Sequence, residues 1–463
     1  MKEHRAPFVL VAWGLIIAFV FAIAVLQTIP AKVKKGYSED PTGLVMVQLQ
    51  GEYLLGVASL LGADQEIAAQ AQILDVGTIA QRQRYMAFMV ALGNPELARE
   101  SSIRMHEELA AQGIELHEQE ARTQEELDLL ASGAEVPSDS EFLREQLGWF
   151  GELLCSDEVQ RTRMESSAGR KVMIVGGMIS CVAFAAIAGF VGLIILFLRS
   201  LSGRVQTRLV RAEPRHGIYA EVFAIWLLLF VGVMTLAGLL GKAVAENDAT
   251  IAMSFSLVAF FASLTALFWA RIRGISWSQI RSDIGWTRGN GILKETFWGI
   301  AGYAMMLPIL GVGVLFVLFL MLLQTFLSSG PGGDPFAPTS GGAHPIVLDI
   351  ANGGWQVRIL LVALAAIAAP IVEETMFRGV LYRQLRTASN KWGIALSIIC
   401  SVLLTSFLFA AIHPQGWVAI PALMAIAIGM NIMREWRGTL LPSMVVHGVS
   451  NAIVTSIMII FLS

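Results

Sequence analysis

Residues 172–198, VMIVGGMISCVAFAAIAGFVGLIILFL, decide the fold class of this chain. The run holds no charged residue, and about 20 apolar residues form a helix long enough to cross the hydrocarbon core of a bilayer. The whole chain of 463 residues is 55% hydrophobic and only 15% charged, whereas a soluble domain carries about 25% charged residues. This composition excludes a soluble globule, a disordered chain, a collagen and a coiled coil. The sequence predicts an all-α, polytopic integral membrane protein.

Eight other runs are apolar enough, or nearly so, to cross the membrane as helices. Tryptophans stand near many of their ends, as expected of side chains that anchor at the membrane interface. The first run is longer than the apolar part of a cleaved signal peptide, and no convincing cleavage site follows it. We therefore interpret residues 1–30 as an uncleaved membrane anchor. The nine predicted spans are residues 8–29, 172–198, 218–240, 250–270, 296–327, 356–372, 394–412, 417–433 and 441–462.

Arginines cluster in the short loops between these spans. The loops 199–216 and 271–290 carry several arginines against one acidic residue each, and further basic residues follow the sixth and eighth spans. A path that alternates across the membrane from a cytoplasmic N-terminus puts all four groups on one side. The positive-inside rule identifies that side as the cytoplasm. We expect a cytoplasmic N-terminus and, from the compact loops, a bacterial inner (plasma) membrane.

The segment 31–170 differs from the rest of the chain in its charge. It holds 24 acidic and 12 basic residues, although the whole chain has a net charge of only −3. Residues 118–130 have the pattern of an amphipathic helix, and Asn94-Pro95 and residues 132–138 predict breaks between helices. We expect an acidic, mostly helical extracytoplasmic domain, whose partner the sequence does not identify. The charge pattern gives no support for nucleic-acid binding. The predicted order is an anchor at 1–30, this domain at 31–170, membrane helices of unassigned role at 171–354 and a catalytic membrane core at 355–463.

Charged side chains enter the apolar spans mainly in the last quarter of the chain. Each costs about 2.5–3.5 kcal/mol to insert and is therefore a candidate functional group. The first group is Glu373-Glu374, followed by Arg378. Glu374 and Arg378 are four residues apart on a helix, with the acid before the base, which favours an ion pair. Glu373 then lies about 100° further round the helix and can face a cavity.

Two more pairs follow on the next spans, Phe409 with His413 and His447 with Asn451. Each pair is four residues apart, so each projects from one helix face. These two histidines are the only ones of seven that lie in or against apolar helices. One carboxylate, two imidazoles and one amide are sufficient for hydrolysis. The carboxylate takes a proton from water, one imidazole assists, and the remaining donors stabilise the oxyanion.

Two other interpretations of these residues compete with catalysis. A single histidine near a helix end is more often a hydrogen-bonded structural residue, and two adjacent glutamates can lie at the membrane interface. Three such groups on consecutive, otherwise apolar spans favour a site. Glu373, His413 and His447 could also bind zinc, but no His-Glu-x-x-His motif occurs and these side chains are on three separate helices.

In order, Glu-Glu-x-x-x-Arg, Phe-x-x-x-His and His-x-x-x-Asn resemble the CAAX protease and bacteriocin-processing family of intramembrane proteases, which includes the Ras-converting endopeptidase. The resemblance covers residues 355–463. It implies that Glu373 is the general base, that His413 helps to activate water, and that His447 and Asn451 stabilise the oxyanion. Glu374 and Arg378 would support the motif, with Phe409 on the face of His413. The resemblance implies no catalytic metal and no cofactor, with zinc as the minority alternative.

The function expected from this resemblance is hydrolysis of peptide bonds in membrane-associated substrates, with prenylated C-termini as one option. Glu373 and His413 can meet only if the sixth helix extends from about residue 355 to residue 385. Two other classes remain open, a non-enzymatic scaffold or bacteriocin-immunity protein of the same fold, and a proton-coupled transporter. A transporter predicts ionisable groups in both halves of the bundle, whereas here they cluster in the last four spans.

Overall fold

A computed structural model describes residues 8–28, 40–62, 64–134, 140–204, 207–209, 217–244, 248–327, 346–413 and 415–462. Within these ranges every regular element is a helix, which confirms the all-α prediction. The chain divides into two compact units. Residues 1–7, with which the predicted anchor begins, residues 328–345 and Pro414 are among those that lie outside the described residues.

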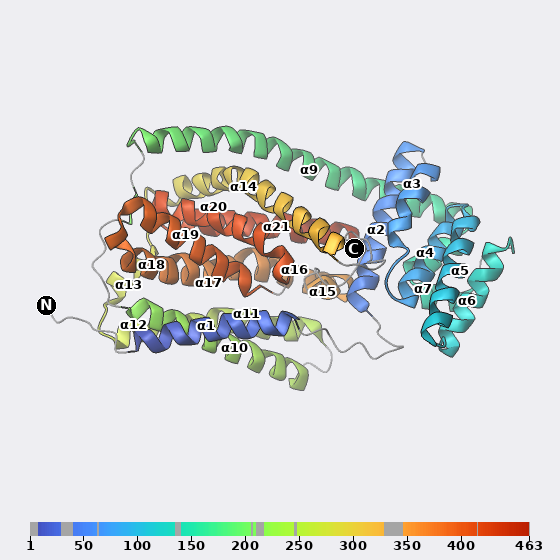
Figure 1. Ribbon diagram of the computed structural model, residues 1–463, viewed down its shortest axis with the longest axis horizontal. Helices are drawn as coiled ribbons and strands as arrows, with labels where there is room; N and C mark the ends of the chain where they lie inside the picture. Colours follow the sequence, from blue (N-terminus) through green and yellow to red (C-terminus); the bar gives the residue numbers. More distant parts are fainter. Residues whose placement is uncertain are drawn as a thin grey trace. The chain divides into compact units, whose positions relative to one another are not determined.

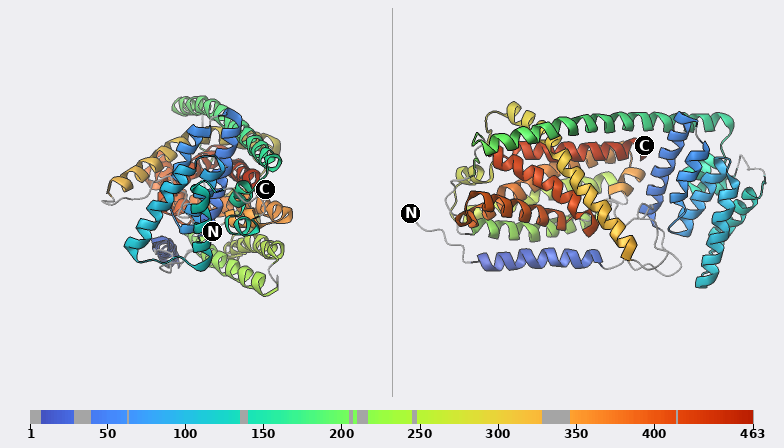
Figure 2. Two further views of the ribbon diagram at one scale, coloured as in Figure 1. Left: turned by 90° about the vertical axis from the view of Figure 1, so that its right-hand side faces the viewer. Right: turned by 45° about the horizontal axis from the view of Figure 1, so that its top comes forward.

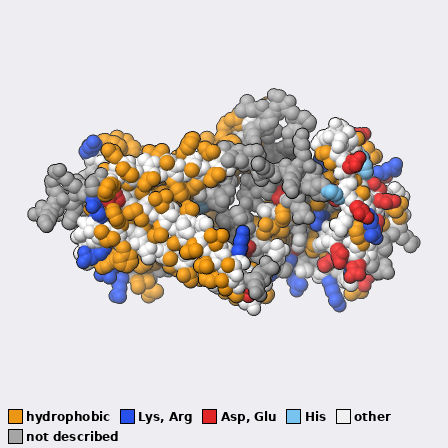
Figure 3. Space-filling model, turned by 90° about the horizontal axis from the view of Figure 1, so that it is seen from below, with side chains coloured by type: hydrophobic (Ala, Val, Ile, Leu, Met, Phe, Trp, Pro, Cys, Tyr) orange, Lys and Arg blue, Asp and Glu red, His pale blue; other side chains and the backbone are white. Residues whose placement is uncertain are grey.

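The first unit, here called the membrane unit, comprises the described residues of Met1–Ile29, Ser180–Leu320 and Asn352–Ser456. Its helices run mostly along one direction, and α14 crosses them obliquely (Figures 1 and 2). Large apolar side chains are exposed along these helices, and Figure 3 shows hydrophobic side chains covering much of one face. Such a surface suits contact with lipid. The helices that lie wholly or mainly in this unit are α1 (Val9–Thr28), α10 (Ile218–Val244), α11 (Ala249–Ser263), α12 (Phe268–Ile272), α13 (Trp277–Ile284), α14 (Ile292–Leu327), α16 (Trp355–Ala363), α17 (Ala369–Glu374), α18 (Tyr382–Ala388), α19 (Ile394–Ala411), α20 (Ile420–Arg437) and α21 (Leu441–Leu462).

The second unit, the helical unit, comprises the described residues of Pro30–Ile179, Met321–Ala351 and Ile457–Ser463. Its core is built from side chains such as Leu55, Tyr85 and Phe150. The amphipathic helix predicted at 118–130 is confirmed as α6, and the break predicted at Asn94-Pro95 separates α4 from α5. Helix α9 continues without interruption through residue 171, where the sequence places a domain boundary. The helices that lie wholly or partly in this unit are α2 (Pro41–Leu61), α3 (Asp64–Ala71), α4 (Ile79–Ala91), α5 (Pro95–Gln112), α6 (Glu118–Ala131), α7 (Glu141–Leu147), α8 (Trp149–Leu154), α9 (Glu158–Leu201) and α15 (Ile346–Asn352).

Ten helices among the described residues are long and apolar enough to cross a membrane. Nine of them match the predicted spans, and the tenth is α2, inside the segment that the sequence assigns to the acidic domain. Its Glu52 is buried and pairs with Lys171 at 2.7 Å. The prediction missed α2 because its polar residues lower its mean hydropathy to 1.4, against 2.8 for α9.

The sixth span is much longer than the run 356–372 that its apolar residues indicate. One continuous helix, here called the glutamate helix, extends over Trp355–Ala388. It joins α16, α17 and α18 through two π-helical segments, Leu364–Ala368 and Thr375–Leu381. The extension to about residue 385, which the meeting of Glu373 and His413 requires, is therefore confirmed.

Buried ion pairs join the glutamate helix to its neighbours near its C-terminal end. Arg386 donates two hydrogen bonds to Glu435 of α20, at 3.1 and 3.0 Å, and the Tyr382 hydroxyl donates to the same carboxylate at 2.8 Å. Arg437 of α20 binds Glu295 of α14 through two bonds of 2.8 Å. These bidentate contacts fix the register of helices that carry the candidate site.

Candidate active site

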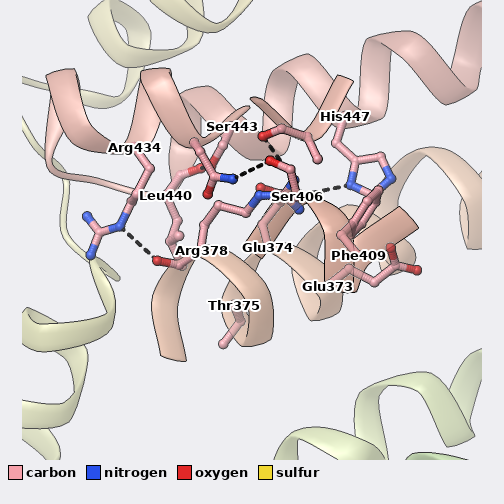
Figure 4. A network of polar contacts seen from close by, with 12 residues as sticks. Glu373, Glu374, Thr375, Arg378, Ser406, Phe409, Arg434, Leu440, Ser443 and His447 are labelled. Atoms are coloured by element: carbon pink, nitrogen blue, oxygen red, sulfur yellow. Dashed lines mark hydrogen bonds and ion pairs between the residues drawn. The ribbon is translucent and has the colours of Figure 1, made fainter. Parts of the chain in front are cut away.

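Glu373 and Glu374 lie near the middle of the glutamate helix, at the end of α17 and directly before the second π-helical segment. Adjacent residues on a helix point about 100° apart, and the two carboxylates have different surroundings. Figure 4 shows Glu374 among Arg378, Ser406 and His447, with Glu373 beside Phe409. The site therefore has two parts, one built on each glutamate.

Glu373 faces His413, which follows the C-terminal end of α19. The Glu373 Oε2 and His413 Nε2 atoms are 3.9 Å apart, and both side chains are partly exposed. Glu373 Oε2 has no hydrogen-bond partner among the described residues. The other imidazole nitrogen of His413, Nδ1, lies 2.5 Å from the carbonyl oxygen of Phe409. That bond orients the ring so that Nε2 points to the carboxylate. We call these two residues the Glu373–His413 pair.

Glu374 belongs to a fully buried group with Arg378 and His447, here called the Glu374 cluster. Glu374 and Arg378 each have 0% exposed surface. Glu374 Oε1 accepts a hydrogen bond from Arg378 Nη1 at 2.8 Å and lies 3.0 Å from His447 Nδ1. The predicted ion pair within the helix is therefore present. The cluster also explains how a buried guanidinium is tolerated, since Arg378 Nη2 donates to the carbonyl of Ala427 on α20.

The two parts of the site meet at Phe409. Its ring centroid lies 4.3 Å from that of His413 and 5.9 Å from that of His447. The Arg378 guanidinium lies over the same ring at 4.5 Å, within the range of a cation–π contact. One residue from each of the three motif groups, Arg378, His413 and His447, thus contacts this ring or lies near it.

Asn451 lies one helical turn beyond His447 on α21. Its Nδ2 donates to the carbonyl oxygen of Ala365 at 2.8 Å. Ala365 is in the first π-helical segment, just before Pro370. Proline has no N–H to donate to the preceding turn. A backbone carbonyl of that turn can therefore accept a hydrogen bond from a side chain of another helix. The bond to Ala365 uses one of the two N–H groups of the Asn451 amide.

The described residues hold no group of three His, Cys, Asp or Glu side chains arranged to bind a metal ion. Glu373, His413 and His447, the set considered for zinc, do not form such a group. The residues present therefore do not fit the zinc alternative in this arrangement, and no catalytic step below passes through a metal.

Comparison with known proteins supports this assignment of the C-terminal helices. Residues 355–453 match the family described as type II CAAX prenyl endopeptidase Rce1-like. This similarity extends over about a fifth of the chain. The match confirms the resemblance and covers every residue of the two parts of the site. No curated protein and no solved structure shows a significant match to the chain.

Several residues of the Rce1-like segment and its surroundings were not anticipated from the sequence. Asn431 of α20 donates to Ser406 of α19 at 3.0 Å, deep in the bundle. Trp286, in the loop after α13, donates to Thr375 next to Glu374 at 2.9 Å. Asn431 could have been found as an amide inside the predicted eighth span. No sequence signal connects Trp286 with Thr375, because the contact joins segments 89 residues apart.

Proposed function

We propose that this integral membrane protein is a glutamate-dependent endopeptidase, which hydrolyses peptide bonds of membrane-associated substrates. The match of residues 355–453 to a family of prenyl endopeptidases supports a peptidase. The observation that carries the mechanism is the approach of Glu373 Oε2 to His413 Nε2 at 3.9 Å. This separation is too long for a direct hydrogen bond and suits one water molecule bound to both atoms.

Glu373 acts as the general base in this proposal. Its carboxylate takes a proton from the water, His413 orients the water, and the hydroxide oxygen attacks the carbonyl carbon of the peptide. The resulting oxyanion collapses, the carbon–nitrogen bond breaks, and the amine leaving group receives the proton that Glu373 holds. Glu373 suits this role because none of the described residues hydrogen-bonds its Oε2, so this oxygen is available to a water molecule.

His447 and Asn451 stabilise the oxyanion in the same proposal. Glu374 Oε1 lies 3.0 Å from His447 Nδ1, and this contact holds the imidazole ring. In this proposal the other ring nitrogen, Nε2, is directed to the oxyanion. The second N–H of Asn451 supplies a further donor. Prenylated C-terminal peptides are the proposed substrate class, in keeping with the description of the matching family.

The decisive experiment replaces Glu373 by glutamine in the purified full-length protein. Glu373→Gln keeps size and hydrogen-bonding capacity but removes the base, so turnover of a prenylated peptide should fall about 10²–10⁴-fold. Thermal unfolding should be unchanged, because Glu373 Oε2 makes no hydrogen bond in the described structure. Full activity of Glu373→Gln would rule out the mechanism.

A matched control removes a carboxylate that precedes the glutamate helix in the chain. Asp349, on α15, is exposed, and Asp349→Asn should leave turnover unchanged. Loss of turnover in both variants would point to a general effect of charge on the protein.

A further inference from the structure

A groove lies on the outside of the membrane unit, between the glutamate helix and α21. It has a volume of about 570 Å³, within the range of about 300–1,000 Å³ typical of ligand sites. Its walls are apolar and include Ile367, Pro370 and Ile371 of the glutamate helix and Met444, Val445 and Val449 of α21. We call it the outer groove. None of the residues of the Glu373–His413 pair or the Glu374 cluster lines it.

The outer groove is closed at one end by the loop that precedes α14. Trp286 and Arg288 of this loop form its rim. The loop is held to the start of α21, because Leu440 N donates to Gly285 O at 3.0 Å and Thr439 Oγ1 donates to Thr287 O at 2.6 Å. The end of the groove is therefore built by specific contacts.

The length of the groove corresponds to one leaflet of a bilayer. From Leu440 at the rim to Val449 at the far end, α21 rises ~14 Å at 1.5 Å per residue. Half of the hydrocarbon core is about 15 Å. Trp286 is partly exposed at the rim, where a tryptophan is expected at the membrane interface. The groove thus reaches from the interface to about the bilayer centre.

Among the described residues, the rim of the outer groove carries a positive charge that has no ion-pair partner. Arg288 is exposed and forms no ion pair among the described residues. The nearby carboxylate of Glu295 is already neutralised by Arg437, through two bonds of 2.8 Å. A ligand with an apolar tail and an anionic head group matches both the walls and the rim.

We propose that the outer groove binds an acyl chain of an anionic bilayer phospholipid, with its phosphate at Arg288. The groove opens on helices that face the bilayer, so a lipid of the adjacent leaflet enters without crossing the protein. Because the reacting side chains do not line the groove, its occupant is a bilayer lipid and not the cleaved peptide.

Quenching of tryptophan fluorescence by brominated acyl chains tests this proposal directly. The full-length protein is reconstituted in phosphatidylcholine with brominated phosphatidylglycerol or brominated phosphatidylcholine, and the Trp286 signal is obtained by subtracting the Trp286→Phe variant. The anionic lipid should quench Trp286 at lower mole fraction. Arg288→Gln should reduce this preference about fivefold. The matched control Arg281→Gln, an exposed arginine of α13 that does not line the groove, should not change it.

A second pair of variants tests the groove itself and retains Trp286. Ile367 lines the groove and is 57% exposed, whereas Ile359 is 64% exposed on the same helix and does not line it. Ile367→Phe should weaken quenching by the anionic lipid, and Ile359→Phe should leave it unchanged. Equal quenching by both lipids, or equal behaviour of the two isoleucine variants, would overturn the proposal. So would displacement of the brominated lipid by a prenylated peptide but not by unlabelled phosphatidylglycerol. These readouts do not involve proteolysis, so their failure is separate from failure of the proposed function.

Discussion

The Glu373–His413 pair and the Glu374 cluster begin at adjacent residues but have opposite surroundings. Glu373 is partly exposed and its Oε2 accepts no hydrogen bond in the described structure. Glu374 is fully buried. Its Oε1 contacts both Arg378 and His447, whereas its Oε2, like that of Glu373, accepts no hydrogen bond in the described structure. A carboxylate that must take a proton benefits from few partners, whereas one that holds other groups in place needs strong ones. The difference separates a proposed chemical role from a proposed positioning role.

The largest effect on stability is expected from Glu374→Ala. This change leaves the buried Arg378 without its ion-pair partner, and such breaks cost about 3–5 kcal/mol. The free energy of unfolding should fall by that amount, together with activity. The double variant Glu374→Ala/Arg378→Leu removes both charges and should recover stability without recovering activity. An unfolding transition of Glu374→Ala equal to that of the wild type would remove the contrast between the two glutamates.

Asn451→Ala should reduce activity more than stability, in contrast to Glu374→Ala. Loss of one oxyanion donor costs about 2.7–4 kcal/mol of transition-state stabilisation, seen as a fall in kcat. Loss of the bond to Ala365 should cost only about 0.5–1.5 kcal/mol of folding free energy. Steady-state kinetics and thermal unfolding of the same preparation measure both quantities. If the free energy of unfolding fell by as much as the activation free energy rose, Asn451 would be a structural residue only.

Gly448→Ala tests how closely α21 must approach the glutamate helix. A Cβ at this position would lie 2.6 Å from the carbonyl oxygen of Ala366, so α21 must shift and move both His447 and Asn451. We expect a destabilisation of about 1–3 kcal/mol and a smaller loss of activity than for Asn451→Ala. Gly311→Ala is the control, because no atom lies within 4 Å of a Cβ at this site. Equal unfolding temperatures for the two variants would contradict the close packing of α21 against the glutamate helix at Gly448.

The smallest effect is expected from removal of metal ions. The proposed pair of Glu373 and His413 activates water without zinc, so a chelator should leave turnover of a purified preparation unchanged. If chelation abolished turnover and near-stoichiometric zinc alone restored it, Glu373, His413 and His447 would have to be reconsidered as ligands.

The membrane class, nine of the ten candidate spans among the described residues and the members of the candidate site could be predicted from the sequence. Apolar runs and isolated charges within them are local properties, because each span must satisfy its own backbone hydrogen bonds and contact lipid. Helix α2 was not predicted as a span, because Glu52 and other polar residues interrupt its apolar pattern. The apolar residues alone also underestimate the length of the glutamate helix, for a similar reason. Its second half carries charges, and buried partners such as Glu435 neutralise them.

The sequence by itself determined which side chains are available for chemistry, because their four-residue spacings place them on common helix faces. Only the tertiary structure decided how these side chains are paired. His447 contacts Glu374 and not Glu373, Asn451 bonds to the carbonyl of Ala365, and Trp286 bonds to Thr375. These contacts depend on the register between helices that are distant in the chain. Packing and buried hydrogen bonds set that register after the separate helices have formed, and no local spacing encodes it.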